Sequence, residues 1–404
     1  MMRNEVHFNA FNPDAPVPPE LFVGRKKEIN LYQEALERTM GGQARNLMVV
    51  GEPGIGKTSF LHLVRGNYTP TDALAIYLSL GTSRTVDEAC AAIIDKIYSR
   101  TKALSKRIKE TLTMVQGFTV GPLGIQFVPT EKRPVLANQF PRLLEAIWDD
   151  HISKDYEALV IFWDEAHYLS HQEYFANFMK SLMEQLALDG YGKIMNVLAL
   201  QDTELEVMIR YHGRITGVFQ EVGLANLSEK ETFELVDKAL AESIPPKKAK
   251  KEFKDNLWFH SEGIPSFVHA IGWSSYEVDE DGILDFSDLA KGLTGTNEVK
   301  GAMEILWFKF FQDRYSRKIQ SNTYRQVLEA MASILSDEIK VEEIREELER
   351  KKINLGNALN VYLGTMVKRG VIYKVEDKRG FYRMDRMFKL FLRLAAAGII
   401  EKKR

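Results

Sequence analysis

The chain contains a single cysteine, Cys90, in 404 residues. One cysteine excludes a disulfide within the chain and a zinc site built from cysteines, and it is typical of proteins in a reducing compartment. No segment approaches the run of about 18 apolar residues that a membrane-spanning helix requires. Arg3 and Glu5 stand where a signal peptide would carry its apolar core. We therefore expect a cytoplasmic protein with no membrane partner.

The chain also lacks a strong overall charge, because 54 Lys and Arg residues face 56 Asp and Glu residues. The charge is unevenly placed, since residues 306–404 hold 22 Lys and Arg against 13 Asp and Glu. A basic end on a mildly acidic body indicates a polyanion partner for that end. Ordinary variation of charge along the chain is the alternative.

The segment Gly51–Thr58 fits the pattern G-x-x-x-x-G-K-[ST] and directly follows the apolar run Leu47–Val50. This is the pattern of a phosphate-binding P-loop. Its glycines permit a tight turn whose N–H groups face one anion, and a helix that starts near Lys57 aims its positive end at the same place. We expect Lys57 to reach the β- and γ-phosphates of a nucleotide and Thr58 to offer its hydroxyl to Mg²⁺.

A second apolar run, Leu159–Trp163, ends in two carboxylates. Asp164 at the strand tip is expected to hold Mg²⁺ through water, and Glu165 to polarise the water that attacks the γ-phosphate. The alternative is an acidic pair that stabilises the start of a helix. The letters Asp164–His167 also spell the box of one helicase class, but the rest of the chain shows no second motor domain.

Strands and helices alternate over the first half of the chain. The strands predicted besides Leu47–Val50 cover residues 74–80, 158–163 and 196–200. This alternation predicts a parallel sheet with helices on both faces. Ligands bind such sheets at the carboxyl ends of the strands, where the P-loop, Asp164 and Gln201 all fall. Residues 117–128 predict two short strands, for which edge packing or a subunit contact is expected.

After about residue 227 the strand signal stops. Ser228 with Glu231 three residues later predicts a capped helix start, and residues 228–300 are mostly helical. Three predicted helices and a hairpin at 371–384 then outline a winged helix. The predicted domains are an N-terminal extended arm (1–20), a P-loop ATPase domain (21–226), an all-α lid (227–305) and a winged helix-turn-helix with a C-terminal helix (306–404).

The residues Phe22-Val23-Gly24-Arg25, followed by Glu28, resemble the box that opens AAA+ ATPases of the origin-recognition-initiator type, STAND signalling ATPases and archaeal-type ATPases. The resemblance implies that Phe22 and Val23 flank an adenine base and that Gln201 is the polar sensor 1 residue. Gly263-Ile264-Pro265 resembles an element of the helical lid. Ser266 follows where replication initiators place an arginine, which favours the STAND and archaeal-type branch.

The resemblance implies ATP or ADP with Mg²⁺ as cofactors. The nucleotide-binding residues expected are Phe22, Val23, Gly51, Glu52, Pro53, Gly54, Ile55, Gly56, Lys57, Thr58, Ser59 and Pro265, with Thr58 and Asp164 at the metal. AAA+ relatives often supply an arginine to a neighbour's γ-phosphate, which raises turnover by ~10³-fold or more. Of Arg210 and Arg214, Arg214 is the predicted finger, and it implies a homo-oligomer; a solvated surface arginine is the alternative. The expected catalytic residues are Lys57, Glu165, Gln201 and Arg214.

The predicted third helix of the winged unit carries amides and basic residues that suit base edges and phosphates, and basic residues on the wing suit phosphates. The residues expected to bind double-stranded DNA are Asn357, Asn360, Lys368, Lys378, Arg379 and Arg383. Docking onto an unknown protein partner, or autoinhibition, is the alternative, because winged helices also bind proteins.

These patterns predict an ATP-hydrolysing AAA+ switch whose nucleotide state controls DNA binding through the winged helix, in a replication, transposition or plasmid-maintenance role. Turnover is expected to be slow and stimulated by DNA or a partner. Two further classes remain: a STAND-like signalling or defence ATPase with the winged helix as a docking or autoinhibitory module, and a scaffold that holds ADP and barely turns over.

Overall fold

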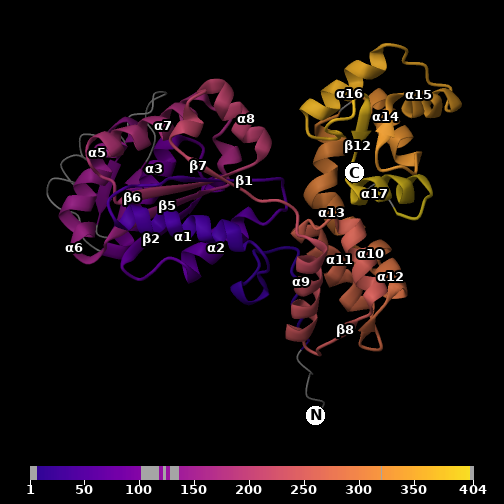
Figure 1. The fold of residues 1–404 in the computed structure, drawn as a ribbon, viewed down its shortest axis with the longest axis horizontal. Coiled ribbons are helices and arrows are strands. Elements are labelled where there is room, and N and C mark those ends of the chain that lie inside the picture. Colours follow the sequence, from indigo (N-terminus) through magenta and orange to yellow (C-terminus); the bar gives the residue numbers. More distant parts are fainter. Residues whose placement is uncertain (1–6, 102–117, 122–123, 128–135, 320, 401–404) are drawn as a thin grey trace. The chain divides into compact units, whose positions relative to one another are not determined.

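The computed structural model describes residues 7–101, 118–121, 124–127, 136–319 and 321–400. The chain forms two units, and one of them combines segments from both ends of the chain (Figure 1). One unit is Pro18–Ala225, and the other combines the residues before Pro18 with those from Asn226 onward. No helix among the described residues is long and apolar enough to cross a membrane.

The Pro18–Ala225 unit is built on a five-stranded parallel sheet in the order β2-β5-β6-β1-β7. The strands are β1 (Leu47–Val50), β2 (Ala73–Ser79), β5 (Ala158–Asp164), β6 (Ile194–Leu200) and β7 (Gln220–Gly223). The α-helices are α1 (Lys26–Met40), α2 (Lys57–Asn67), α3 (Val86–Thr101), α5 (Leu136–Ile147), α6 (Ser153–Asp155), α7 (Glu173–Leu188) and α8 (Asp202–Tyr211). Shorter helical turns are η1 (Pro19–Leu21), η2 (Leu80–Thr82), η3 (Trp148–Ile152), η4 (Ala166–Tyr168) and η5 (Ile215–Gly217). An antiparallel hairpin joins β3 (Phe118–Gly121) to β4 (Gly124–Phe127), as the sequence predicts.

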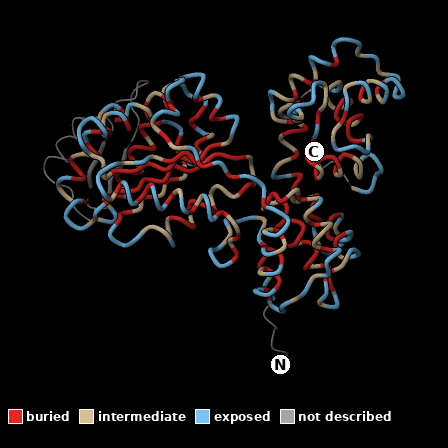
Figure 2. The backbone as a smooth tube through the Cα atoms, in the orientation of Figure 1, coloured by how far each residue is buried: buried red, intermediate tan, exposed pale blue. Residues whose placement is uncertain are grey.

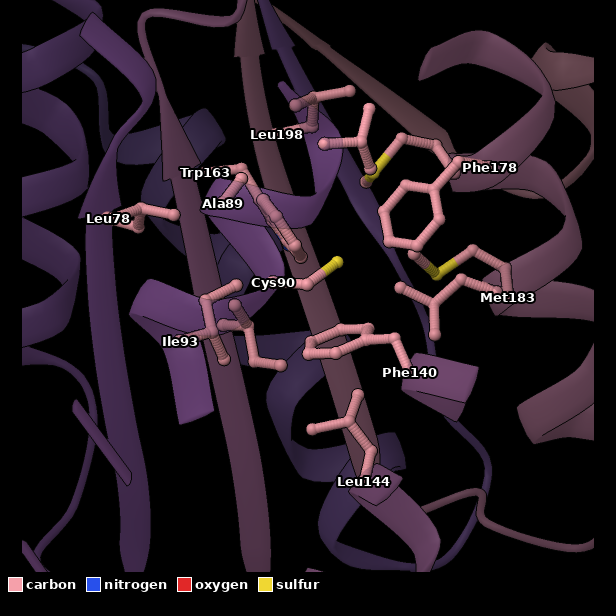
Figure 3. Packing of buried hydrophobic residues seen from close by; sticks show 14 of the residues in the cluster. Leu78, Ala89, Cys90, Ile93, Phe140, Leu144, Trp163, Phe178, Met183 and Leu198 are labelled. Carbon is pink, nitrogen blue, oxygen red and sulfur yellow. The ribbon is translucent and has the colours of Figure 1, made fainter. Parts of the chain in front are cut away.

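Alternate residues of each strand point to opposite faces of the sheet, and both faces are buried (Figure 2). In β5, Val160 and Phe162 join the cluster that packs against α1 and α2. Ile161 and Trp163 join the cluster formed with α3, α5 and α7. Figure 3 shows the second cluster, in which Cys90 lies buried near Trp163. The predicted parallel sheet with helices on both faces is therefore confirmed.

The second unit contains a helical lid and a winged helix. The lid helices are α9 (Glu229–Glu242), α10 (Lys251–Ser261), α11 (Pro265–Val278) and α12 (Phe286–Thr294), and the short strands β8 (Lys248–Ala249) and β9 (Ile283–Leu284) pair in parallel. The predicted cap of α9 is present, because Glu231 N–H donates to Ser228 Oγ at 3.3 Å and Ser228 N–H donates to Glu231 Oε2 at 2.8 Å.

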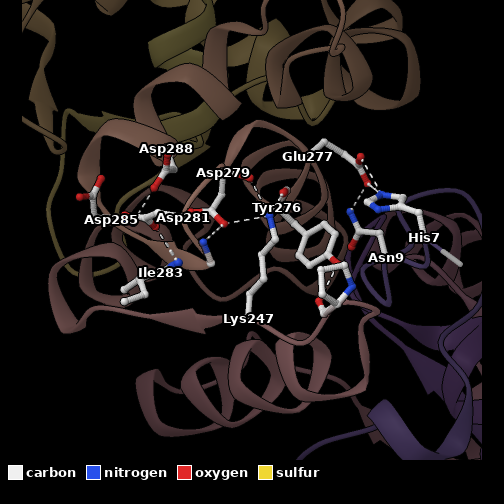
Figure 4. Close-up of polar contacts among 12 residues, drawn as sticks. His7, Asn9, Lys247, Tyr276, Glu277, Asp279, Asp281, Ile283, Asp285 and Asp288 are labelled. Atoms are coloured by element: carbon white, nitrogen blue, oxygen red, sulfur yellow. Dashed lines mark hydrogen bonds and ion pairs between the residues drawn. The ribbon is translucent and has the colours of Figure 1, made fainter. Parts of the chain in front are cut away.

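The residues before Pro18 that the structure describes pack on this lid. Phe8 and Ile244 exchange backbone hydrogen bonds of 2.9 and 2.7 Å. Asn9 donates to Glu277 at 2.8 Å (Figure 4). Phe11 is only 1% exposed, and its ring occupies the space where a side chain on Gly272 would lie, since a Cβ there would come within 2.4 Å of it. The arm is thus built into the lid's core.

The winged helix follows a connecting helical segment of α13 (Ala302–Leu306), η6 (Trp307–Phe311) and η7 (Asp313–Arg317). Its helices are α14 (Asn322–Ser333), α15 (Val341–Arg350), α16 (Ala358–Lys368) and α17 (Arg386–Ala396), and its three-stranded antiparallel sheet has the order β10 (Ile339–Lys340), β12 (Phe381–Arg383), β11 (Tyr373–Lys374). The rings of Trp307 and Phe391 stack with centroids 4.5 Å apart. The predicted lid and winged helix are both confirmed as folds.

Candidate nucleotide site

The P-loop connects β1 to α2, as its sequence predicts. Gly54 and Gly56 adopt φ values of +84° and +96°, a region that residues with a Cβ rarely enter, and Gly56 caps the start of α2. At Gly51 a Cβ would come within 2.8 Å of the Leu224 carbonyl oxygen. The glycines therefore permit both the turn and the close approach of β7's end to the loop.

Lys57 opens α2, and its ammonium is held by the loop itself. Nζ donates to the carbonyl oxygens of Gly51 at 2.7 Å and Glu52 at 3.0 Å. Burial lowers the pKa of Lys57, while the charges of nearby carboxylates, Glu204 first and Asp164 among them, act in the opposite direction. The ammonium thus lies among the carboxylates of this edge of the sheet, where a phosphate would provide it with a counter-charge.

The predicted carboxylates lie at the carboxyl end of β5. Asp164 is 2% exposed. Its Oδ1 accepts the Glu165 backbone N–H at 2.8 Å, and its Oδ2 accepts the Tyr77 hydroxyl at 2.7 Å. Glu165 has a φ of +56°, and its Oε2 accepts a hydrogen bond from the Ser79 hydroxyl. Asp164 therefore ends the strand, Glu165 directly precedes the short helical turn η4, and the two side chains have separate partners on β2.

The donor set fits a magnesium ion that is completed by phosphates. Mg²⁺ in nucleotide sites uses one or two protein ligands, waters and phosphate oxygens rather than a cage of side chains. Thr58 in the first turn of α2 and Asp164 at the end of β5 are donors of this kind. No group of three or more metal-binding side chains is found among the described residues.

Gln201 follows β6, which lies between β5 and β1 in the sheet. It is the N-cap of α8, and its backbone N–H donates to Glu204 Oε2 at 2.7 Å. Burial raises the pKa of Glu204. The three neighbouring strands β1, β5 and β6 thus bring Lys57, Glu165 and Gln201 to one edge.

The segment before α1 also reaches the P-loop. Val23 is buried, and Phe22 packs against the cluster that lies under α1 and α2. Arg25 is buried with a φ of +62°, and its Nη2 donates to the Ile55 carbonyl at 3.4 Å. Arg25 therefore supports the backbone of the P-loop. The adenine contacts of Phe22 and Val23 stay a prediction.

The predicted finger residues are on the surface. Arg210 lies in the last turn of α8 and Arg214 caps η5, and both are exposed. In the described part of the chain neither forms an ion pair. In the lid, Pro265 is the first residue of α11, after Gly263, where a Cβ would come within 2.0 Å of the Leu227 carbonyl.

The predicted DNA-binding residues fall into two groups. Asn357, Asn360, Lys368 and Arg379 are exposed. Lys378 instead forms an ion pair with Glu338. Arg383 lies 3.8 Å from Glu262 and stacks over Tyr373.

Other basic residues of the winged helix serve the interior. Arg314 forms a buried ion pair with Asp385. Lys389 donates to the carbonyls of Leu335 and Ser336, and Arg393 to those of Ala332 and Ile334. Cations are favourable at the carboxyl end of a helix, so Arg393 caps α14, and Lys389 binds the segment that follows this helix.

Sequence reasoning missed Arg25, Ser79, Tyr77 and Glu204. Arg25 stands within the motif that was recognised, and Glu204 follows Gln201 by three residues, the spacing of a capping pair. Ser79 and Tyr77 end a predicted strand, but only the strand order reveals that this strand borders Asp164 and Glu165.

Residues 21–189 match the AAA ATPase domain family. Similar solved structures include the Walker-type ATPase PABY2304 of Pyrococcus abyssi, at 16% identity and a TM-score of 0.60 over 92% of this chain and 96% of that one. The Aeropyrum pernix ORC2 protein in its ADP form has 12% identity and a TM-score of 0.55, covering 97% and 98%. The Aeropyrum pernix ORC1 protein in complex with DNA has 11% identity and a TM-score of 0.51, covering 99% and 100%.

No curated protein matches this sequence significantly. Because the sequence identities are this low, the similarity to these solved structures establishes a shared fold only. The predicted resemblance is confirmed at that level: residues 21–189 match the AAA ATPase domain family, and the fold of the chain resembles those of the Pyrococcus abyssi Walker-type ATPase and the Aeropyrum pernix ORC1 protein.

Proposed function

We propose that this chain is an ATP-hydrolysing switch whose nucleotide state controls DNA binding by the winged helix. The observation that carries the proposal is the convergence of Lys57, Asp164, Glu165 and Gln201 at one edge of the sheet. A lysine for phosphate, a carboxylate for a metal and a second carboxylate for water are the groups that ATP hydrolysis requires.

Each residue has a task that follows from its position. The P-loop N–H groups and the N-terminus of α2 bind phosphate oxygens, and Lys57 exchanges its loop carbonyls for the β- and γ-phosphates. Thr58 and Asp164 would hold Mg²⁺, which would neutralise phosphate charge when bound. Glu165 accepts a proton from the attacking water, Gln201 donates to the γ-phosphate, and Arg214 of a neighbouring copy stabilises the charge that develops.

Two backbone contacts support a route from the nucleotide to the lid. Leu224 N–H donates to the carbonyl of Val50, the residue before the P-loop, at 2.8 Å. Leu227 N–H donates to the Gly263 carbonyl in the lid, also at 2.8 Å. Only Ala225 and Asn226 lie between these two hydrogen-bonded residues along the chain.

Further contacts support a route from the lid to the winged helix. Glu262, beside Gly263, accepts the backbone N–H of Arg386 at 2.8 Å, and its other oxygen lies 3.8 Å from Arg383. The Arg386 side chain donates to the Phe259 carbonyl at 3.1 Å and stacks on the ring of Phe259, 4.0 Å from its centroid. A lid that responds to the nucleotide would carry the first turn of α17 and the wing with it.

For the DNA-binding part, the support is α16. It lies in the position of a recognition helix, after α14 and α15, and exposes Asn357, Asn360 and Lys368. Asparagine amides pair with adenine edges and lysines with phosphates. Of the solved structures with this fold, that of the ORC1 protein is a complex with DNA.

A protein-docking or autoinhibitory winged helix is the second candidate. Two of the predicted wing contacts, Lys378 and Arg383, already have acidic partners within the chain. On α16, Val361 is 68% exposed, and an exposed apolar side chain in the middle of a helix suits a protein partner. In this reading the chain is a STAND-like ATPase that the winged helix holds shut until a partner protein opens it.

Fluorescence anisotropy of labelled duplex DNA, with ATP, ADP or no nucleotide at two salt concentrations, tests the proposal. We expect salt-sensitive binding that differs between the nucleotide states. The double variant Lys368→Glu and Arg379→Glu should abolish it, because both residues are exposed. Lys251→Glu, at an exposed lid position, shows whether a charge reversal elsewhere on the surface also weakens binding.

The outcomes separate the candidates. Loss of binding in the double variant but not in Lys251→Glu supports a DNA-acting ATPase. No binding in any nucleotide state, with ATP still hydrolysed, contradicts the DNA reading and favours the docking role.

A further inference from the structure

Tyr77 lies beside the carboxylate assigned to the metal. Strands β2 and β5 pair in parallel so that Tyr77 is opposite Phe162 and Ser79 is opposite Asp164. The Tyr77 hydroxyl donates to Asp164 Oδ2 at 2.7 Å. The backbone N–H of Glu165 donates to Oδ1 at 2.8 Å. Both oxygens of this buried carboxylate therefore have a donor that fixes its rotation.

The ring of Tyr77 is braced from α2. The imidazole of His62 lies 4.6 Å from it, centroid to centroid, and the guanidinium carbon of Arg65 lies 5.2 Å from its centroid. His62 follows Thr58 by four residues, so both side chains are on one face of α2. The helix that carries one expected metal ligand, Thr58, thus supports the tyrosine that holds the other, Asp164.

We propose that Tyr77 is a positioning residue for Mg²⁺: its hydroxyl holds Asp164 in the orientation that receives the metal's water ligands. This inference rests on the proposed function. In this role Tyr77 acts through Asp164 and is not itself a ligand of the ion. A carboxylate offers about four lone-pair sites, and the two donors occupy one on each oxygen, so the remaining lone pairs have a fixed direction and would be available to the waters of a bound metal.

Metal affinity depends on such partners of the ligand. Hydrogen bonds to a ligating group are typically worth 10–100-fold in metal affinity or activity. Phenylalanine would fill nearly the same volume and keep the ring contacts with His62 and Arg65, and it would lack the hydroxyl that donates to Asp164. The variant Tyr77→Phe therefore separates the positioning role from packing.

The test measures magnesium rather than turnover. A fluorescent ADP analogue is titrated onto the full chain in EDTA and at increasing free Mg²⁺. For Tyr77→Phe we expect the Mg²⁺ concentration at half-maximal enhancement of ADP binding to rise by about tenfold or more. The affinity in EDTA should stay at the wild-type value, because no contact with the nucleotide is lost.

Two further variants guard the interpretation. Tyr32→Phe also removes a hydroxyl that is hydrogen-bonded in the structure, to Thr69, and should leave the Mg²⁺ requirement unchanged. His62→Ala loosens the brace on Tyr77 and should raise the Mg²⁺ requirement by less than Tyr77→Phe does.

Three results would overturn the inference: an unchanged Mg²⁺ requirement in Tyr77→Phe, an equal loss of affinity in EDTA, or wild-type binding that does not depend on Mg²⁺. A wild-type chain that binds no nucleotide with or without Mg²⁺ would instead contradict the proposed function itself.

Discussion

The two units use buried polar groups for different purposes. In Pro18–Ala225, the buried Asp164 and the partly buried Lys57 and Glu165 gather at one edge of the sheet, where their partners orient groups that can act on a phosphate. In the other unit, buried polar groups join segments that are distant in sequence. Lys247 Nζ contacts the Tyr276 carbonyl and the Asp279 carboxylate (Figure 4), and Arg314 pairs with Asp385. The first unit gathers charged groups at the proposed nucleotide site, and the second unit uses them to hold its own segments together.

A substitution should therefore change activity in the Pro18–Ala225 unit and stability in the other unit. Replacing a polar side chain at the edge of the sheet should leave this unit folded, because the hydrogen-bond partners of that side chain orient it. A buried group between arm, lid and winged helix should affect the folding of that unit and leave nucleotide binding intact.

The largest effect is expected for Glu165→Gln. Losing the proposed general base should lower ATP turnover by about 10²–10⁴-fold. The amide oxygen still accepts from Ser79, so nucleotide affinity and the melting temperature should stay close to wild type. Steady-state ATPase assays and ADP-analogue binding measure the two quantities. Glu206→Gln, exposed on α8, is the matched control. Full turnover in Glu165→Gln would remove Glu165 from the mechanism.

Phe11→Ala should break the other unit instead. Emptying the space of a buried phenylalanine costs about 3–5 kcal/mol, and here it separates the arm from α11. Hydrogen exchange of the full chain should lose protection in α9 and α11 and keep it in β1 and β5. Phe8→Ala serves as the control, because Phe8 is 51% exposed. If protection falls equally in β1 and β5, the two units do not have separate stabilities.

The buried His269 should make the lid sensitive to acid. Burial lowers its pKa to about 4. Nδ1 accepts the Asn12 N–H at 3.3 Å, and Nε2 has no hydrogen-bond partner among the described residues. Between pH 6.5 and 4 the unfolded chain binds a proton that the folded chain does not, so stability falls as the pH falls through this window. The loss reaches up to about 3 kcal/mol.

Urea denaturation at a series of pH values measures this dependence. His269→Asn keeps an acceptor for Asn12 and should flatten the curve between pH 6.5 and 4, whereas the exposed His171→Asn in the other unit should not. An unchanged pH dependence in His269→Asn would mean that other groups cause the acid sensitivity.

The sequence sufficed where chemistry and backbone are both local. The P-loop glycines dictate the turn, and Asp164 and Glu165 end an apolar run, so their place at the strand's end follows from the pattern. Ser79 and Tyr77 required the pairing of β2 with β5, which no local pattern encodes. The four-residue strand β7 was missed because it has only one buried side chain, Val222.

Composition likewise could not reveal where charges point. The positive excess of residues 306–404 predicts a polyanion partner. The side chains of Lys389 and Arg393, however, donate hydrogen bonds to backbone carbonyls just after the end of α14. The arm was predicted only as an extended segment, because the burial of Phe11 depends on Gly272, far along the chain.

The smallest effect is expected for a substitution on the exposed surface of α16. Lys368 is exposed at the end of α16 and has no ion pair among the described residues. If it contacts a phosphate, Lys368→Ala should weaken duplex binding uniformly across DNA sequences and reduce the slope of log K against log salt by about one. Lys251→Ala should leave the slope unchanged, and neither variant should change ATP turnover without DNA or the melting temperature. An unchanged slope in Lys368→Ala would mean that this end of α16 does not face the DNA backbone. The exposed Val361, two turns earlier on α16, would then favour a protein partner.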